Sequence, residues 1–261
     1  MATVFYEPST RTRFSFESAM LRLGGSVISS EAAGHFSSAY KGETLEDSIR
    51  VIGSYADIIV LRHPEVGASE RAIAVSTVPI VNAGDGAGEH PTQALLDLYT
   101  IRTELGRLEN MTIALIGDLK NGRTIHSLIH LLGLIPTMHI ILVSPESLQL
   151  PDELLMGLRA TRAKVTIIQD LKQALLEADV VYMTRIQKER FNTPEEYNSV
   201  KGSYILGPTD LPLLKLQSVI LHPLPRIDEI HPSVDNDARA AYFRQTKHGL
   251  FLRMALIDSL L

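Results

Sequence analysis

The chain of 261 residues contains no cysteine, which excludes disulfides, thiolate metal sites and a cysteine nucleophile. It also lacks an excess of cations, because 25 Lys and Arg oppose 30 Asp and Glu for a net charge of −5. That balance argues against general nucleic-acid binding, which depends on an excess of cationic surface. The longest apolar runs, such as 58–61, are far below membrane-spanning length. The first seven residues have no basic region or apolar core typical of a signal peptide. We expect a cytoplasmic protein with neither a nucleic-acid nor a membrane partner.

The length and the apolar content predict a globular chain of about two domains, at roughly 150 residues per domain. Hydrophobic residues make up 45% and charged residues 21%, a balance that excludes disorder. Short β-branched apolar runs recur without alternation of polar residues, which is typical of strands buried on both faces of a parallel sheet. The expected strands are 3–6, 58–61, 79–81, 113–116, 140–143, 165–168, 180–183 and 219–221.

Helical patterns lie between these runs. Phe16, Met20 and Leu23 recur at the spacing of one helix face, for example. The alternation predicts an α/β protein with two domains, each a parallel β-sheet flanked by helices. We expect a first domain over 1–106, completed by a C-terminal helix over 242–261, and a second domain over 107–241. Ligands of such sheets bind at the carboxyl ends of the strands, so residues that follow each run are the candidates.

The strongest local motif is STRTR at residues 9–13, between a predicted strand and a predicted helix. A helix N-terminus presents unpaired N–H groups and the positive end of the helix dipole, which together bind anions. The hydroxyls of Ser9, Thr10 and Thr12 add donors, and Arg11 adds a forked cation suited to phosphate. The alternative is a simple Ser/Thr helix cap with solvated arginines.

A second motif, HPTQ at residues 90–93, follows a glycine-rich turn. His90 and Gln93 are three residues apart, so they share one side of the first helical turn and could face a carbonyl and its amide. The alternative is a histidine that caps the helix or lies on the surface. The preceding glycines read G-x-G-x-G, which is not the dinucleotide-binding spacing.

A third motif, at residues 117–124, differs by one residue from a P-loop, with Arg123 where the phosphate-binding lysine would stand. No later apolar strand ends in the aspartate that would hold Mg²⁺. We interpret the loop as one that directs Arg123 at a carboxylate, and keep nucleotide binding as an alternative.

The fourth motif is HPLPR at residues 222–226, after a predicted strand. Two prolines around Leu224 impose a rigid extended loop and leave backbone carbonyls free as acceptors, although a simple loop would look the same. Further polar groups follow other strands or lie in a Ser/Gly-rich loop. They are Arg62, Arg185, Gln187 and Lys41. Cations gathered at strand ends in a chain of negative net charge indicate a positively charged site that attracts polyanionic substrates.

Taken together, these motifs resemble the aspartate/ornithine carbamoyltransferase superfamily, and most closely the catalytic chains of its aspartate branch. STRTR is typical of the superfamily. KGET at 41–44, HPTQ at 90–93, GRT at 122–124 and HPLPR at 222–226 are typical of the aspartate branch. The ornithine branch usually carries cysteines in the counterparts of HPTQ and HPLP. Family members usually have helical sequence before the first strand, so this chain is expected to be short at its N-terminus, with apolar surface uncovered there.

The resemblance implies transfer of the carbamoyl group from carbamoyl phosphate to L-aspartate, giving N-carbamoyl-L-aspartate and phosphate, an early step of pyrimidine biosynthesis. It implies no cofactor and no metal. The domain over 1–106 would bind carbamoyl phosphate, and the domain over 107–241 would bind aspartate. The implied assembly is a homotrimer with shared active sites, with regulatory chains as possible partners.

The resemblance also implies a role for each candidate residue. The phosphate would be held by Ser9, Thr10, Arg11 and Thr12, and the carbonyl oxygen by Thr12, Arg62 and His90. Gln93 and the carbonyls of Leu224 and Pro225 would accept from the carbamoyl NH₂. Aspartate would be bound by Arg123, Arg185, Gln187, Leu224 and Lys41. Ser37 and Lys41 would complete the carbamoyl-phosphate site of a neighbouring chain. The residues expected to be catalytic are Arg11, Thr12, Arg62, His90 and Lys41.

Three alternatives stay open at this point. The chain could be a carbamoyltransferase for another amine acceptor, a P-loop-like nucleotide-binding protein built on residues 117–124, or a truncated homologue without catalytic activity that serves as an interaction partner.

Overall fold

The computed structural model describes residues 1–31, 42–86 and 88–261. It divides into two compact units, one made of Met1–Leu96 and Lys247–Leu261 and the other of Asp97–Thr246. Both divisions fall inside a helix, α5 (Pro91–Leu105) or α10 (Tyr242–Leu260), so these two helices contribute residues to both units. Each unit holds a parallel β-sheet flanked by helices, which confirms the expected fold class.

The sheet of the first unit has the strand order β2-β1-β3-β4, and every neighbouring pair is parallel. Its strands are β1 (Ala2–Phe5), β2 (Ile28–Glu31), β3 (Ile59–His63) and β4 (Ile80–Asp85). β2 was not predicted. Its four residues read ISSE and lie on the sheet edge, half-buried or exposed, so they lack the apolar run by which the other strands were found.

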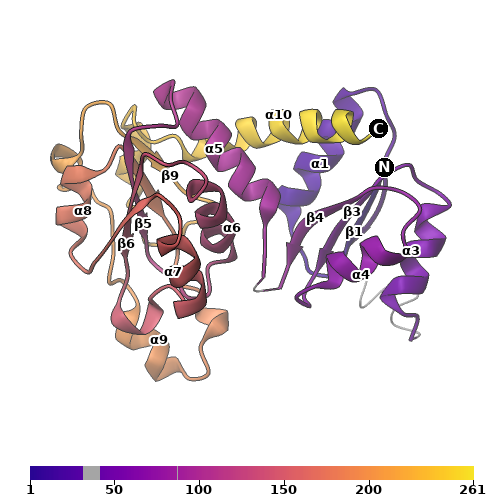
Figure 1. The fold of residues 1–261 in the computed structure, drawn as a ribbon, viewed down its shortest axis with the longest axis horizontal. Helices are drawn as coiled ribbons and strands as arrows, with labels where there is room; N and C mark the ends of the chain where they lie inside the picture. The colour runs from indigo at the N-terminus through magenta and orange to yellow at the C-terminus, as the bar shows by residue number, and fades with distance from the viewer. Residues whose placement is uncertain (32–41, 87) are drawn as a thin grey trace. The chain divides into compact units, whose positions relative to one another are not determined.

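Helices cover both faces of this sheet (Figure 1). The helices α1 (Thr10–Arg22) and α10 supply Phe16, Met20 and Ile257 to one core, whereas α3 (Leu45–Gly53) and α4 (Ala68–Val75) supply a second core on the opposite face. Neighbouring strand residues alternate between the two cores because side chains of a strand alternate in direction. The expectation that Leu23 lies on the core face is wrong. α1 ends at Arg22, and Leu23 is 39% exposed.

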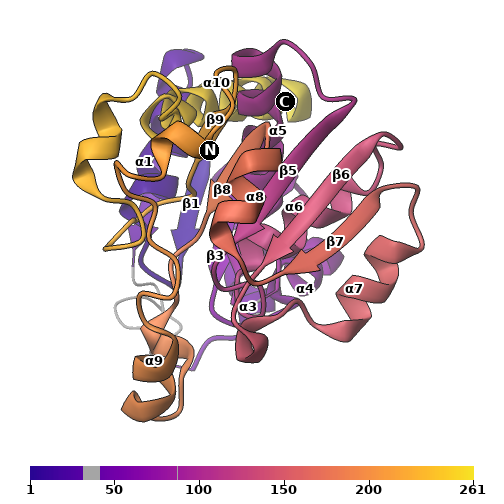
Figure 2. The same cartoon turned by 90° about the vertical axis from the view of Figure 1, so that its left-hand side faces the viewer.

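The sheet of the second unit has the order β7-β6-β5-β8-β9 and is also parallel (Figure 2). Its strands are β5 (Met111–Ile116), β6 (Met138–Val143), β7 (Lys164–Ile168), β8 (Val180–Met183) and β9 (Val219–Leu221). The chain first builds outward from β5 to β7 and then returns to place β8 on the other side of β5. The loops after β5 and β8 therefore diverge at a topological switch point, the position at which such sheets bind ligands.

The flanking helices of the second unit are α6 (Arg123–Leu132), α7 (Asp152–Arg159), α8 (Leu171–Glu177) and α9 (Pro194–Val200). Short 3₁₀ helices lie at Glu146–Leu148, Lys188–Arg190, Leu211–Leu213 and Pro232–Asn236. α8 packs against one face of the sheet, and α6 and α7 lie on the other (Figure 1). Across the described ranges, no helix combines the length and the apolar character needed to span a bilayer.

A buried carboxylate joins several elements of the second unit. The hydroxyl of Tyr182 in β8 donates to Oδ2 of Asp97 in α5 at 2.7 Å, and the amide of Gln245 in α10 donates to Oδ1. The carbonyl oxygen of the same amide accepts from the backbone N–H of His222 after β9 at 3.1 Å. A charged group in an apolar interior must be paired or hydrogen-bonded, so these donors make the burial of Asp97 tolerable.

We expect Asp97→Ala to lower the free energy of unfolding by about 2–3 kcal/mol, because the buried donors on Tyr182 and Gln245 would lose their acceptor. Asp258→Ala is the matched control, since Asp258 is exposed near the end of α10 and its loss should change stability by less than about 0.5 kcal/mol. Urea denaturation of both variants measures the difference, and equal stabilities would show that the network contributes nothing.

Candidate functional site

In the first unit the STRTR motif lies at the start of α1, as predicted. Ser9 is the residue before the helix, and its side chain makes no capping hydrogen bond among the described residues. The simple-cap interpretation therefore does not account for Ser9. Thr12 is buried, whereas Thr10 and Arg11 are exposed at the helix start. The motif thus combines hydroxyls, a guanidinium and the helix N-terminus in one turn, which suits a phosphate.

Arg62 lies in β3 next to β1, and is only 7% exposed. Its guanidinium pairs with Glu7, with 2.9 Å between Nη2 and Oε2, and donates to the carbonyl of Ala83 at 3.3 Å. Glu7 belongs to the turn that leads into α1, so this ion pair holds the buried cation beside the STRTR motif. Glu7 was not predicted as a partner of Arg62. Its position just after the first strand was the available signal.

His90 and Gln93 lie at the start of α5, and both are buried. Burial rules out the alternative that His90 is a surface residue. The N–H of Gln93 donates to the carbonyl of His90 at 3.0 Å, so both residues belong to one turn. The structure therefore gathers Ser9–Thr12, Arg62, His90 and Gln93 at the carboxyl edge of one sheet, each after or at the end of a strand.

The glycine-rich turn before His90 binds the loop after β3. The carboxylate of Asp85 accepts the N–H of Gly67 at 3.0 Å and that of Glu89 at 2.7 Å. Gly86 has a φ of +54° and donates its N–H to His63, and a Cβ there would lie 2.3 Å from the carbonyl oxygen of Pro64. These glycines therefore permit close approach of two backbones. Asp85, which the sequence analysis did not single out, fixes the turn that carries His90.

In the second unit the loops after β5 and β8 are joined by hydrogen bonds. Asp118 is fully buried and accepts from the backbone N–H of Asn121 at 2.9 Å and from its side-chain amide at 3.1 and 3.2 Å. The side-chain amide of Gln187 donates to the carbonyl of Asn121 at 3.0 Å. These bonds bring Arg123, at the start of α6, to the same edge as the segment that carries Arg185 and Gln187.

The same loop does not have the character of a P-loop. The N–H of Leu119 donates to the carbonyl of Leu148 at 3.2 Å, and that of Asn121 is taken by Asp118. A phosphate-binding loop needs such N–H groups directed at the ligand. Gly117 serves packing, because a Cβ there would lie 2.3 Å from the carbonyl oxygen of Thr184.

Arg185 follows β8 and forms a two-bond ion pair with Glu189, one of whose bonds measures 3.0 Å. The hydrogen bond from the guanidinium lowers the pKa of the Glu189 carboxyl. This pairing fixes the direction of a planar cation that is suited to bind a carboxylate. Glu189 was not predicted, although an acidic residue four positions after a strand-end arginine was a usable signal.

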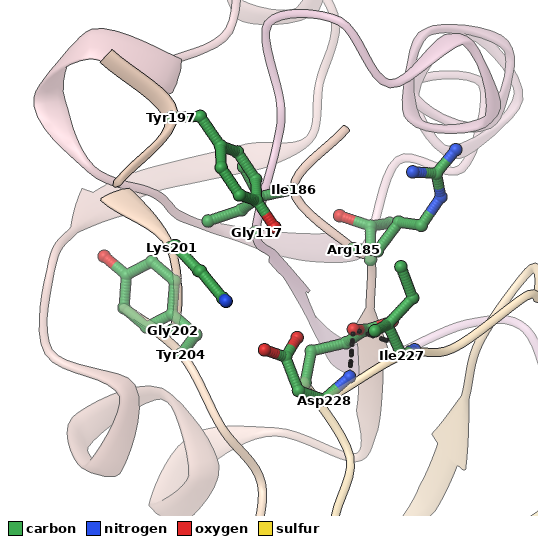
Figure 3. Close-up of a pocket in the computed structure, with 11 residues that line it drawn as sticks. Gly117, Arg185, Ile186, Tyr197, Lys201, Gly202, Tyr204, Ile227 and Asp228 are labelled. Carbon is green, nitrogen blue, oxygen red and sulfur yellow. Dashed lines mark hydrogen bonds between the residues drawn. The ribbon is translucent and has the colours of Figure 1, made fainter. Parts of the chain in front are cut away.

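A pocket lies at the switch point between β5 and β8 (Figure 3). Its lining includes Gly117, Thr184, Arg185 and Ile186. Side chains of Tyr197, Lys201 and Tyr204 border one side, and residues 227–229 border the other. Figure 3 shows the ammonium of Lys201 and the carboxylate of Asp228 directed into the same space. Tyr197, Lys201 and Asp228 were not predicted, because nothing local marks them as polar groups of a pocket.

The HPLPR loop follows β9, as predicted. The expectation of an extended loop is wrong at Leu224, whose φ of +56° lies in the left-handed region, and the peptide bond to Pro225 is cis. Arg226 at the end of the loop pairs with Asp235 and donates to the hydroxyl of Tyr242 at 3.0 Å. Ser37 and Lys41 lie outside the described residues, so their expected roles stay predictions.

Comparison with known proteins covers both units. Residues 1–103 match the family model of the aspartate/ornithine carbamoyltransferase carbamoyl-P binding domain, and residues 109–260 match that of the Asp/Orn binding domain. The chloroplastic aspartate carbamoyltransferase of Arabidopsis thaliana is 53% identical over 100% of this chain and 67% of its own length. The catalytic subunit of the Thermoplasma volcanium enzyme is 54% identical, over 100% of this chain and 85% of the relative.

Solved structures agree. Aspartate transcarbamoylase from Trypanosoma cruzi, in complex with carbamoyl phosphate and aspartate, superposes with a TM-score of 0.94 at 46% identity, covering 100% of this chain and 84% of the other. The catalytic subunit from M. jannaschii gives 0.91 at 51% identity, covering 99% and 84%. With both domains matched in order and more than half of the residues shared with curated relatives, the chain belongs to the aspartate/ornithine carbamoyltransferase family.

Proposed function

We propose that this chain transfers the carbamoyl group of carbamoyl phosphate to the amino group of L-aspartate, releasing phosphate. The observation that carries the proposal is the buried guanidinium of Arg62, held by Glu7 beside the STRTR turn. The buried cation and the start of α1 together place positive charge where a phosphate and a neighbouring carbonyl oxygen would bind. The 46% identical enzyme solved with carbamoyl phosphate and aspartate supports the same pair of substrates.

The chemistry needs positioning and charge stabilisation from the protein. The amine attacks the carbonyl carbon of carbamoyl phosphate, negative charge develops on the carbonyl oxygen, and the C–O bond to phosphate breaks. Thr12, Arg62 and His90 would stabilise the developing oxyanion. The leaving phosphate can take the proton from the amine, so no protein base is required. Holding two substrates in attacking geometry supplies much of the remaining acceleration.

In the first unit, Ser9, Thr10, Arg11 and Thr12 would bind the phosphate group. The amide of Gln93 would accept from the carbamoyl NH₂ together with the carbonyls of Leu224 and Pro225. Because the carbamoyl NH₂ is a neutral donor, neutral carbonyl oxygens are suitable acceptors for it.

In the second unit, Arg123, Arg185 and Gln187 would bind the two carboxylates of aspartate, with Leu224 beside them. Two guanidinium groups favour a dicarboxylate over ornithine, whose side chain ends in an ammonium that they would repel. This arrangement favours aspartate over another amine acceptor.

We further propose a homotrimer in which Ser37 and Lys41 complete the site of a neighbouring chain, and a place in pyrimidine biosynthesis. These proposals rest on the family resemblance of the motifs, as does the possibility of regulatory chains. Cytoplasmic location stays a prediction, because the relatives from Arabidopsis and pea are named chloroplastic.

A coupled assay of phosphate release tests the function. We expect release that depends on carbamoyl phosphate and L-aspartate together, with N-carbamoyl-L-aspartate as the second product. Ornithine in place of aspartate serves as the comparison. Phosphate release with ornithine but not with aspartate would mean that the enzyme uses another amine acceptor. Absence of phosphate release with either amine would support a non-catalytic homologue.

Arg185→Ala should raise the KM for aspartate about 10- to 100-fold, the loss expected for a charge-assisted hydrogen bond to a carboxylate. Binding of carbamoyl phosphate should stay within about twofold, because its proposed ligands lie mainly in the first unit. Arg159→Ala, at an exposed position of α7, is the control. Steady-state kinetics measure the KM for each substrate. An equal rise in the KM for aspartate and for carbamoyl phosphate would refute this division of roles.

Sharing of sites predicts complementation between inactive chains. Lys41→Ala and His90→Ala homotrimers, dissociated and reassembled together, should regain activity, because some sites would combine an intact His90 with an intact Lys41 of a neighbour. A mixture as inactive as its two parents would mean that each chain completes its own site.

A further inference from the structure

His222, the first residue of the HPLPR loop, has no part in the proposed chemistry, yet it is 2% exposed and fully hydrogen-bonded. Its Nδ1 lies 2.8 Å from the backbone nitrogen of Leu224, and its Nε2 lies 2.7 Å from Oε1 of Glu229. The backbone N–H of His222 donates to the side-chain carbonyl oxygen of Gln245, whose amide nitrogen donates to Asp97. Both ring nitrogens and the backbone N–H of His222 are therefore hydrogen-bonded.

These contacts determine the protonation of the ring. A backbone N–H can only donate, so Nδ1 must act as the acceptor and carries no proton. The single proton of the neutral imidazole therefore lies on Nε2 and is donated to the Glu229 carboxylate. Burial lowers the pKa of His222, which agrees with a neutral ring.

Glu229 holds the other end of the loop. Its Oε2 accepts from the backbone N–H groups of Ile227 and Asp228, each at 3.2 Å, shown as dashed lines in Figure 3. Burial raises the pKa of Glu229, but the hydrogen bonds from His222 and the backbone outweigh this effect, and the net pKa lies below its ordinary value. His222 and Glu229 together therefore join residue 224 to residues 227 and 228.

Leu224 needs such support because its φ of +56° lies in the left-handed region, which is unfavourable for any residue that has a Cβ atom. The hydrogen bond from its N–H to His222 stabilises that conformation. The direction of the Leu224 carbonyl depends on the same backbone angles, and so does the direction of the Pro225 carbonyl that follows.

We propose that His222 and Glu229 form a buried positioning pair that aims the carbonyls of Leu224 and Pro225 at the carbamoyl NH₂. This inference rests on the proposed function, which assigns those carbonyls to the carbamoyl group. The pair acts through the backbone and does not touch the substrate.

The test compares kcat per folded enzyme in three variants. His222→Ala removes the acceptor for Leu224 and should lower kcat on the order of 10²-fold, the effect of displacing a reacting group by about 1 Å. The KM for carbamoyl phosphate should rise only a few-fold, because the phosphate has its own ligands. His222→Asn can still accept the N–H two residues ahead, so its kcat should fall less than about tenfold.

His231→Ala is the matched control. His231 also accepts, through Nδ1, the N–H of the residue two positions later, at 3.2 Å from Ser233, but it is exposed and lies outside the HPLPR loop. Its kcat should stay within about twofold of the parent. Equal kcat values for His222→Ala and the parent, or equal losses in His222→Ala and His222→Asn, would overturn the positioning role.

Nitrogen-15 NMR of the unmodified protein gives a readout that needs neither turnover nor a variant that folds. We expect His222 to show a protonated Nε2 and a bare Nδ1 at neutral pH, and a proton on Nδ1 would overturn the proposal. The two proposals fail separately. An inactive parent enzyme refutes the proposed function, whereas an active parent with an unaffected His222→Ala variant refutes only the positioning pair.

Discussion

The second unit depends on the requirement that the buried carboxylate of Asp97 be hydrogen-bonded. Its two carboxylate oxygens accept hydrogen bonds from Tyr182 in β8 and from Gln245 in α10. These bonds hold β8 and α10 at fixed distances from α5, which carries Asp97. Gln245 extends the constraint to the backbone of His222, and the imidazole of His222 extends it to Leu224. An apolar contact could tolerate sliding, but hydrogen bonds require defined direction and distance. The geometry of the loop after β9 therefore depends on the carboxylate of Asp97, which lies more than 100 residues earlier in the sequence.

The cations of the candidate site also require hydrogen-bond partners, and acidic side chains provide them. Arg62 is buried and so requires a partner, which Glu7 supplies, while Glu189 orients the half-exposed Arg185. Pairing with a carboxylate fixes the plane of a guanidinium, and a planar fork in a fixed direction is suited to a phosphate or a carboxylate. Several carboxylates serve to position arginines.

The fold class was predictable because most strands are buried on both faces and appear as uninterrupted apolar runs. The edge strand β2 was not, since ISSE carries no such run, and Leu23 was misplaced because α1 ends one residue earlier. Local motifs indicated where chemistry-bearing groups lie, as with STRTR at the start of α1. Asp85, Asp118 and Glu229 could not be found in this way. Asp85 and Asp118 accept from backbone N–H groups of other loops, those of Gly67 and Gln187, and Glu229 pairs with the side chain of His222. Only the tertiary structure defines which of these groups meet.

The character of the acceptors in the HPLPR loop follows from the charge of the proposed substrate. Carbamoyl phosphate carries its negative charge close to the carbamoyl NH₂, so a carboxylate placed to accept from that amide would repel the phosphate. Peptide carbonyls avoid the repulsion because they are neutral, but they cannot be rotated without moving the backbone. A loop that uses them therefore needs groups that fix its dihedral angles. The carboxylate of Glu229 accepts hydrogen bonds from three neutral donors, in His222, Ile227 and Asp228. It therefore stabilises the loop through oxygens that are already hydrogen-bonded.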